Sequence, residues 1–130
     1  MRPLLAPSVD SLTVEAILHA LSDPVRVAIF AAVAEAGCPQ TCTGLASVAG
    51  RPVPKSSLSQ HLKVLRDAGL IRAERRGVEM LNTSRCAEID QRFPGLLAAI
   101  LAAHQRQRQD EASRARTARS RSRGSRRDAT

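Results

Sequence analysis

The sequence predicts a mainly α-helical domain with one small β-hairpin, arranged as a winged helix-turn-helix that dimerises through its first and last helices. Three observations support this fold class. Leu58, Leu62 and Leu65 recur at the i, i+4, i+7 spacing of one helical face. Gly69 ends that helix, and two short alternating stretches follow around Arg76-Gly77. Helical periodicity also occupies residues 12–36 and returns at residues 90–107.

The N-terminal part of the domain predicts two helices separated by a sharp junction. Asp10 or Ser11 is expected to cap the first helix. Ser22-Asp23-Pro24 predicts the start of the second, because proline is tolerated at the opening helical position. This second helix is expected to run from Val25 to about Ala36 and to end at Gly37. Four of its apolar residues are expected to point inward: Val25, Ile29, Phe30 and Val33.

The middle of the chain is expected to hold a short helix and then the helix of the three leucines. The short helix is predicted near Gly44–Ala49. Residues 51–54 contain two prolines, which bias their preceding residues to extended conformations. Ser56 or Ser57 is expected to cap the longer helix, which runs through Asp67.

A hairpin and a final helix complete the predicted domain. Leu70–Arg76 and Val78–Thr83 are expected to pair as antiparallel strands, because Ile71, Ala73 and Val78 alternate with charged neighbours. The last helix is predicted to span roughly Asp90 to Gln107, with Pro94 in its first turn.

The last helix is apolar almost all round. One stripe holds five large side chains, and four alanines cover much of the opposite side: Phe93, Leu96, Leu97, Ile100 and Leu101, then Ala98, Ala99, Ala102 and Ala103. A helix of this kind must be buried on most sides, and a domain of about a hundred residues has little core to surround it. We therefore expect a homodimer built on the first and last helices. Burial within one chain is the alternative.

Positive charge is concentrated at the C-terminal end. The chain has 20 Lys and Arg against 12 Asp and Glu, a net charge of +8. Residues 105–130 contain nine arginines and three acidic residues, a net +6, so residues 1–104 carry only +2. We expect residues 1–10 to be an N-terminal extension, residues 11–107 the winged helix-turn-helix domain, and residues 108–130 a disordered, arginine-rich tail.

Composition disfavours several classes of protein. The longest uncharged apolar run, Gly95–Ala103, is too short to span a membrane, and the N-terminus does not resemble a secretory signal. A cytoplasmic protein with reduced cysteines is therefore expected, with no membrane partner. Phe30 and Phe93 are the only aromatic residues, which disfavours a stacking platform for single-stranded nucleic acid. No grouping of catalytic residues suggests an enzyme.

The helix of the three leucines has a face suited to the major groove of double-stranded DNA. Glutamine can bond adenine bidentately, serine can bond either base edge, and lysine suits guanine or phosphate. In the following hairpin, Arg75 and Arg76 can reach the DNA backbone or minor groove. A merely solvated helix face is the alternative. The outward face carries five polar residues with two more at its flanks: Lys55, Ser56, Ser59, Gln60 and Lys63, then Ser57 and His61.

Three motifs follow one another in the chain: Leu21-Ser22-Asp23-Pro24-Val25-Arg26, Leu58-Ser59-Gln60-His61-Leu62-Lys63-Val64-Leu65 and Ala68-Gly69-Leu70-Ile71. Together they resemble the ArsR-type winged-helix repressors of bacteria, over about residues 12–104. The resemblance implies a dimeric repressor that holds operator DNA until an inducer releases it. It also implies that Lys55, Ser56, Ser59 and Gln60 face bases or phosphates.

The signal that such a protein would sense is less apparent. Many members of that family bind metal through a Cys-x-Cys pair, but Thr41 and Thr43 occupy the matching positions here. We therefore expect no metal and no other cofactor. Cys38 and Cys42 form a candidate thiol switch, because they flank a proline-bearing loop that could bring them together. Loop cysteines without a role are the alternative.

The arginine-rich tail suggests a second function class. It could add phosphate contacts that strengthen DNA binding without sequence choice. The alternative to a sequence-specific regulator is therefore a basic architectural or RNA-associated protein that acts through this tail.

Overall fold

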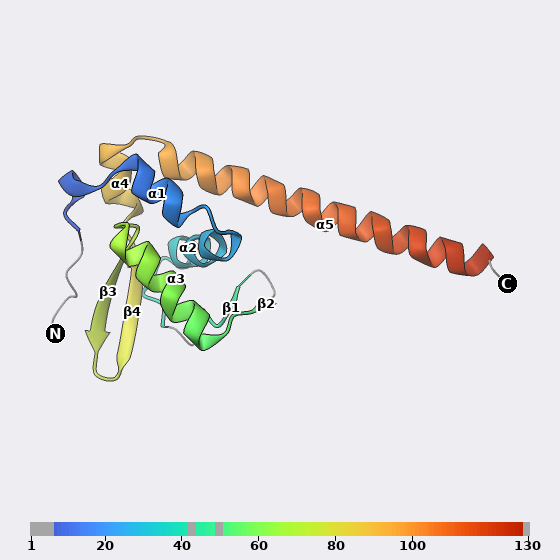
Figure 1. The fold of residues 1–130 in the computed structure, drawn as a ribbon, viewed down its shortest axis with the longest axis horizontal. Coiled ribbons are helices and arrows are strands. Elements are labelled where there is room, and N and C mark those ends of the chain that lie inside the picture. Colours follow the sequence, from blue (N-terminus) through green and yellow to red (C-terminus); the bar gives the residue numbers. More distant parts are fainter. Residues whose placement is uncertain (1–6, 42–43, 49–50, 129–130) are drawn as a thin grey trace. The chain divides into compact units, whose positions relative to one another are not determined.

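The computed structural model describes residues 7–41, 44–48 and 51–128. They form two compact units, the first ending at Leu97 and the second beginning at Ala98. The elements in chain order are η1 (Val9–Ser11), α1 (Val14–Ala20), α2 (Pro24–Ala36), β1 (Ser47–Val48), β2 (Arg51–Pro52), α3 (Lys55–Asp67), β3 (Ile71–Arg76), β4 (Glu79–Ser84), α4 (Cys86–Arg92) and α5 (Leu96–Asp128), as Figure 1 shows. The predicted class, mainly helical with one hairpin in a winged helix-turn-helix, is confirmed.

The first helix starts later than predicted. Asp10 and Ser11 belong to the 3-10 turn η1, and the cap of α1 is Thr13, whose Oγ1 accepts a hydrogen bond from the Ala16 N–H at 3.1 Å. The reason is that Ser11 already donates to the Ser8 carbonyl, which closes a separate turn, and Leu12 is buried behind it.

The junction between α1 and α2 follows the prediction and is closed by hydrogen bonds. Asp23 Oδ1 accepts from the backbone N–H of Val25 and Arg26, at 2.8 and 3.1 Å, and Pro24 opens α2. Arg26 in turn donates through Nε to the Ala20 carbonyl at 2.7 Å, which satisfies the C-terminal end of α1. Burial alone would raise the pKa of Asp23, but these backbone hydrogen bonds and the charges of His61 and Arg26 lower it.

Helix α2 supplies the centre of the core. Ile29, Phe30 and Val33 are buried as predicted, and Gly37 ends the helix with a φ of 65°. The prediction for Val25 was wrong, because its side chain is 36% exposed in the first turn. The buried residues of α2 are instead Val27, Ala28, Ile29, Phe30 and Val33.

The short helix predicted near Gly44–Ala49 is also wrong. The structure has a turn at residues 44–46 and then strand β1, which pairs antiparallel with β2. Prolines hold the returning strand extended, and the Val53 N–H donates to the Ala46 carbonyl at 2.7 Å. Leu45 is buried and anchors the segment.

Helix α3 begins at Lys55 and ends as predicted. Ser56 and Ser57 lie inside its first turn and do not cap it, because the capping position belongs to Pro54. At the other end, Leu70 N–H donates to the Leu65 carbonyl and Gly69 N–H to the Arg66 carbonyl, both at 3.0 Å. This Schellman pattern requires the left-handed conformation that Gly69 adopts, with a φ of 83°.

The hairpin β3–β4 pairs in the register Ile71 with Ser84 through Arg76 with Glu79. The two turn residues are therefore Gly77, with a φ of 65°, and Val78, which is fully exposed. We expected Val78 in the second strand, but the left-handed glycine places the turn one residue later. Gln40 extends this sheet, because its backbone exchanges hydrogen bonds of 2.9 and 2.8 Å with Asn82.

The single last helix predicted from Asp90 is interrupted. Helix α4 ends at Arg92, and α5 starts at Leu96 after Pro94 and Gly95. Gly95 adopts a φ of 81°, and its N–H donates to Asp90 Oδ1 at 3.1 Å. A left-handed residue cannot continue a right-handed helix, so Pro94 lies in the link and not in a first turn.

The tail also differs from the expectation of disorder, because α5 continues to Asp128. Its residues 105–125 are exposed, so the inference that they bury no core is consistent with the structure. A lone helix forms here because arginine, glutamine and alanine are strong helix formers. Two i, i+4 contacts support it, Arg106 Nε to Asp110 Oδ1 at 3.5 Å and Gln107 Nε2 to Glu111 Oε1 at 3.3 Å.

No single helix among the described residues is long and apolar enough to cross a membrane. Helices α1 and α2 meet that test only as a pair, but they are bent by 104° and both contribute residues to the core.

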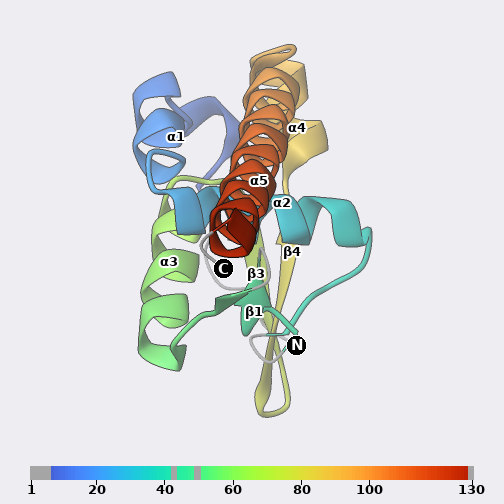
Figure 2. The same cartoon turned by 90° about the vertical axis from the view of Figure 1, so that its right-hand side faces the viewer.

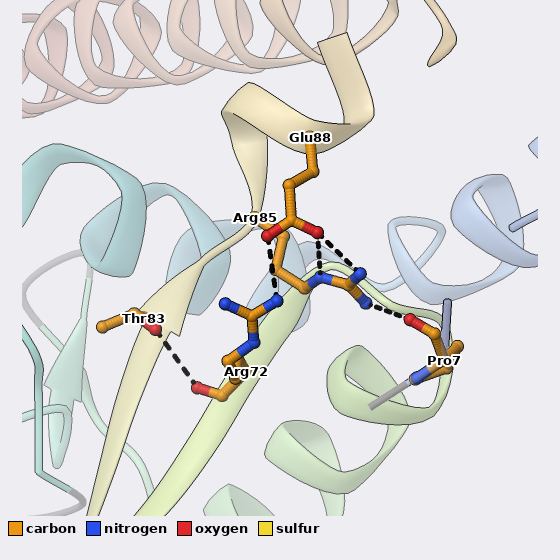
Figure 3. A network of polar contacts seen from close by, with 5 residues as sticks. All are labelled: Pro7, Arg72, Thr83, Arg85 and Glu88. Carbon is orange, nitrogen blue, oxygen red and sulfur yellow. Dashed lines mark hydrogen bonds and ion pairs between the residues drawn. The ribbon is translucent and has the colours of Figure 1, made fainter. Parts of the chain in front are cut away.

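A network around a buried arginine joins three parts of the first unit. Arg85 is 4% exposed, and it donates to Glu88 Oε2 through Nε at 3.2 Å and Nη2 at 2.8 Å, and to the Pro7 carbonyl through Nη1 at 2.7 Å, as Figure 3 shows. Arg72 of β3 donates to the other carboxylate oxygen at 2.9 Å. The network therefore ties the N-terminal segment and the base of the hairpin to α4.

Leu12 extends this connection to the end of α3. A side chain on Gly69 would collide with Leu12 Cδ2 and would lie 3.4 Å from Arg85 Nη1. Arg92 Nε also donates to the Leu12 carbonyl at 3.3 Å. Residue 69 must therefore be glycine for two reasons, its backbone conformation and the close approach of the N-terminal segment.

The network predicts an acid-sensitive contribution to stability. The hydrogen bonds from Arg85, opposed by partial burial and assisted by the charges of Arg85 and Arg72, lower the pKa of Glu88. A carboxyl with a lowered folded-state pKa stabilises the fold above its unfolded pKa, and this contribution is lost as pH falls through the folded value. Glu88→Gln should lower the free energy of unfolding at pH 7 by about 1–3 kcal/mol, because it leaves Arg85 without a charged partner. It should also weaken the loss of stability on acidification, measured by urea unfolding at pH 7 and pH 3.

The matched control is Glu79→Gln, which removes the same charge from an exposed position on β4. It should change stability by less than about 0.5 kcal/mol. Equal losses for the two variants would show that the Glu88 network contributes no specific stability.

Candidate nucleic-acid interface

Helix α3 is anchored by the three leucines that the spacing predicted. Leu58, Leu62 and Leu65 are at most 4% exposed, and the helix packs against α2 and β3. Because these side chains lie on one face, they fix the rotation of the helix about its axis. The opposite face is therefore held outward by the core.

The structure places the polar residues of α3 as predicted. Five are exposed on the outward face, and two are half-buried at its edges: Lys55, Ser56, Ser59, Gln60 and Lys63, then Ser57 and His61. The first group forms one continuous polar surface over about two and a half turns of helix. We call these five residues the α3 face.

His61 is half-buried at the edge of the α3 face. It lies near the junction of α1 and α2, where it contributes to the lowered pKa of Asp23. The sequence showed only that His61 flanks the polar face, because the proximity to Asp23 arises from packing between helices.

Lys63 is engaged in a local ion pair. Its Nζ lies 2.7 Å from Asp67 Oδ2, and both side chains are more than half exposed. An exposed i, i+4 pair of this kind contributes only a few tenths of a kcal/mol, so a phosphate can compete for the ammonium group.

The N-terminal end of α3 is open to an anion. Pro54 occupies the capping position and has no side-chain oxygen to accept from the first N–H groups. Lys55 and Ser56, which begin the helix, are both exposed. The positive end of the helix dipole therefore coincides with a lysine and a serine hydroxyl, a combination that favours phosphate.

The hairpin presents its two predicted arginines to solvent. Arg75 and Arg76 are exposed at the end of β3, directly before the turn. Figures 1 and 2 show this turn and the N-terminal end of α3 on the same, lower side of the first unit. Arg72 is different, because its guanidinium is paired with Glu88 at the base of the hairpin.

The candidate thiol switch is only partly described. Cys38 is exposed, and its Sγ lies 3.3 Å from Gln40 Nε2. Cys42 lies outside the described residues. Cys86 is half-buried at the start of α4. Within residues 7–41, 44–48 and 51–128, no three His, Cys, Asp or Glu side chains gather closely enough to hold a metal ion.

Two comparisons with known proteins agree with this geometry. A protein family described as "Helix-turn-helix domain" matches residues 21–74, which run from the α1–α2 junction through α3 into β3. Among solved structures, the chain is similar to an ArsR-like transcriptional regulator from Rhodococcus sp. RHA1, with a TM-score of 0.51 and 21% sequence identity. The match covers 79% of this chain and 89% of that one. No curated protein matches the sequence.

The matched residues include the junction motif Leu21–Arg26, the anchored helix α3 and its Gly69 stop, in the order that the resemblance requires. The chain therefore contains a helix-turn-helix domain, within a winged-helix fold.

Proposed function

We propose that this protein is a homodimeric, sequence-specific DNA-binding transcriptional regulator that acts as a repressor. The observation that carries the proposal is the α3 face, five exposed polar side chains held outward by three buried leucines. A rigid helix with such a face suits the major groove, which admits an α-helix and displays a distinct bonding pattern for each base pair.

Some side chains of the interface would contact base edges, and others would contact phosphates. Gln60 and Ser59 lie near the centre of the face and suit base edges, with Gln60 able to bond adenine through two atoms. Lys55 and the open N-terminal end of α3 suit a phosphate. Arg75 and Arg76 would hold the flanking backbone, which adds affinity without sequence choice.

A dimer is supported by apolar surface on two helices, each considered separately. In α1, Leu18 is 50% exposed on a short helix. In the second unit, the N-terminal part of α5 carries Ala98, Ala99, Ala102 and Ala103 exposed. Pairing two copies would cover such surface and would place two α3 helices on a two-fold symmetric DNA site.

Repression with release by an inducer is proposed from the resemblance to the ArsR-type repressors. For the inducing signal we propose oxidation of Cys38 and Cys42. The exposure of Cys38 supports this proposal, because a redox-sensitive thiol must be accessible.

Base contacts by α3 predict a loss of affinity limited to the operator. The operator is first selected from random duplexes by the wild-type protein. Gln60→Ala or Ser59→Ala should then weaken binding to it by about 1–3 kcal/mol and leave binding to random DNA unchanged. Arg75→Ala is the matched control, because loss of a phosphate contact should weaken both duplexes equally. Equal losses on both duplexes for Gln60→Ala would contradict a base contact.

If α1 forms the dimer interface, a charged residue placed on it should prevent dimerisation. Leu18→Lys should shift the protein from dimer to monomer in sedimentation equilibrium, because a charge cannot be buried without a partner. His19→Lys adds the same side chain at the neighbouring exposed position and should leave the dimer intact. A monomeric wild-type protein would refute the proposal directly.

The thiol switch predicts redox-sensitive binding. A mild oxidant should lower the affinity of the wild-type protein for the selected operator at least ten-fold, and a thiol reductant should restore it. Cys38→Ser should abolish the response, whereas Cys86→Ser should retain it. A response that survives Cys38→Ser would rule out this pair of thiols.

A further inference from the structure

The C-terminal part of α5 is an exposed and strongly basic helix. Residues 105–125 are helical and exposed along their whole length. They contain seven arginines and two acidic residues, and their only apolar side chains are alanines. This surface lies wholly within the second unit.

The helical conformation sorts these arginines onto two sides. At 3.6 residues per turn, four of them fall within about a quarter of the circumference, while Arg114 and Arg121 lie about half a turn away. The four form what we call the arginine stripe: Arg108, Arg116, Arg119 and Arg123. Three members of the stripe line one open hollow with the small residues Ser120 and Gly124. A side chain added at Gly124 would meet nothing within 4 Å, so the helix surface is open there.

The acidic residues of this segment are bonded to other side chains. Asp110 pairs with Arg106, which lies outside the stripe. Glu111 accepts a hydrogen bond from Gln107. The stripe therefore keeps its positive charge, while the Arg116 guanidinium also donates to Ser113 Oγ at 3.3 Å.

We propose that the arginine stripe binds the phosphate backbone of double-stranded DNA as one face of a rigid helix. Guanidinium groups match phosphate oxygens with paired N–H donors. A duplex carries about one negative charge per 1.7 Å of its axis, so successive turns of the helix meet phosphates whatever the base sequence. The stripe adds affinity and faster association, and leaves base choice to α3.

The composition of the segment favours duplex DNA over other anionic partners. Single-stranded nucleic acid is held by stacked aromatic side chains, and both phenylalanines of the chain precede α5. A membrane surface requires large apolar side chains opposite the basic face, and alanine alone does not supply them. The stripe is also covalently joined to a helix-turn-helix domain, which would raise its effective concentration near DNA. This last argument rests on the proposed function.

The proposal differs from binding by a flexible basic tail in one measurable respect. In a flexible chain every arginine is equivalent, so only the number of charges matters. On a helix, only one side can lie against the duplex at a time. Two pairs of arginines with the same charge, taken from opposite sides of α5, must therefore contribute unequally.

The test compares two double variants of the full-length protein on a random-sequence DNA duplex. Arg119→Gln with Arg123→Gln removes two charges from the stripe, and Arg114→Gln with Arg121→Gln removes two from the other side. Glutamine is nearly as good a helix former as arginine, and circular dichroism checks that helix content is retained. The measured quantity is the slope of log affinity against log salt concentration.

The stripe variant should reduce this slope by about 1.8, at 0.9 for each lost phosphate contact, and the control should reduce it by less than about 0.5. Arg119→Lys with Arg123→Lys, which keeps the charge, should retain the slope. Equal reductions by the two Gln variants would overturn the proposal, as would tighter binding to an RNA duplex of the same sequence. Base reading is tested separately: if Gln60→Ala shows no operator defect while the stripe effect remains, only the proposed function of α3 fails.

Discussion

The burial of Leu58, Leu62 and Leu65 is the constraint on which the rest of the interface depends. An isolated helix of thirteen residues is marginal in water, so α3 owes its stability and its orientation to this packing. Since the three leucines define the inner face, they also decide which side chains point outward. The Schellman stop at Gly69 completes this arrangement, because it ends the helix while burying Leu65 and Leu70.

A second layer of interactions holds the pieces around α3 in place. The Arg26 side chain closes the end of α1, while Asp23 begins α2 and lies near His61 of α3. On the other side, Arg85 and Glu88 connect the N-terminal segment, β3 and α4. A buried guanidinium is costly unless all its donors are used, which makes this network sensitive to the loss of any one partner. The orientation of the hairpin relative to α3 depends on these contacts.

In the proposed function, the two units make different electrostatic contributions to DNA binding. Residues 1–104 carry a net charge of only +2, so base choice must come from a few placed side chains on α3. The C-terminal part of α5 concentrates arginines on an exposed helix, which suits salt-dependent attraction without base choice. A regulator must do both, because it searches a large excess of non-specific DNA before it meets its site.

The sequence by itself determined the features that depend on local spacing. The Asp23-Pro24 cap, the Gly37 and Gly69 stops, the inner leucines of α3 and the five residues of its outward face are all set within a few residues of chain. The helical order of the tail is also local, because a composition too polar to form a core still favours a lone helix. Only the tertiary structure decided the pairing of β1 with β2, the break before Leu96 and the burial of Arg85. These depend on partners distant in sequence or on a left-handed glycine, whose effect no apolar periodicity records.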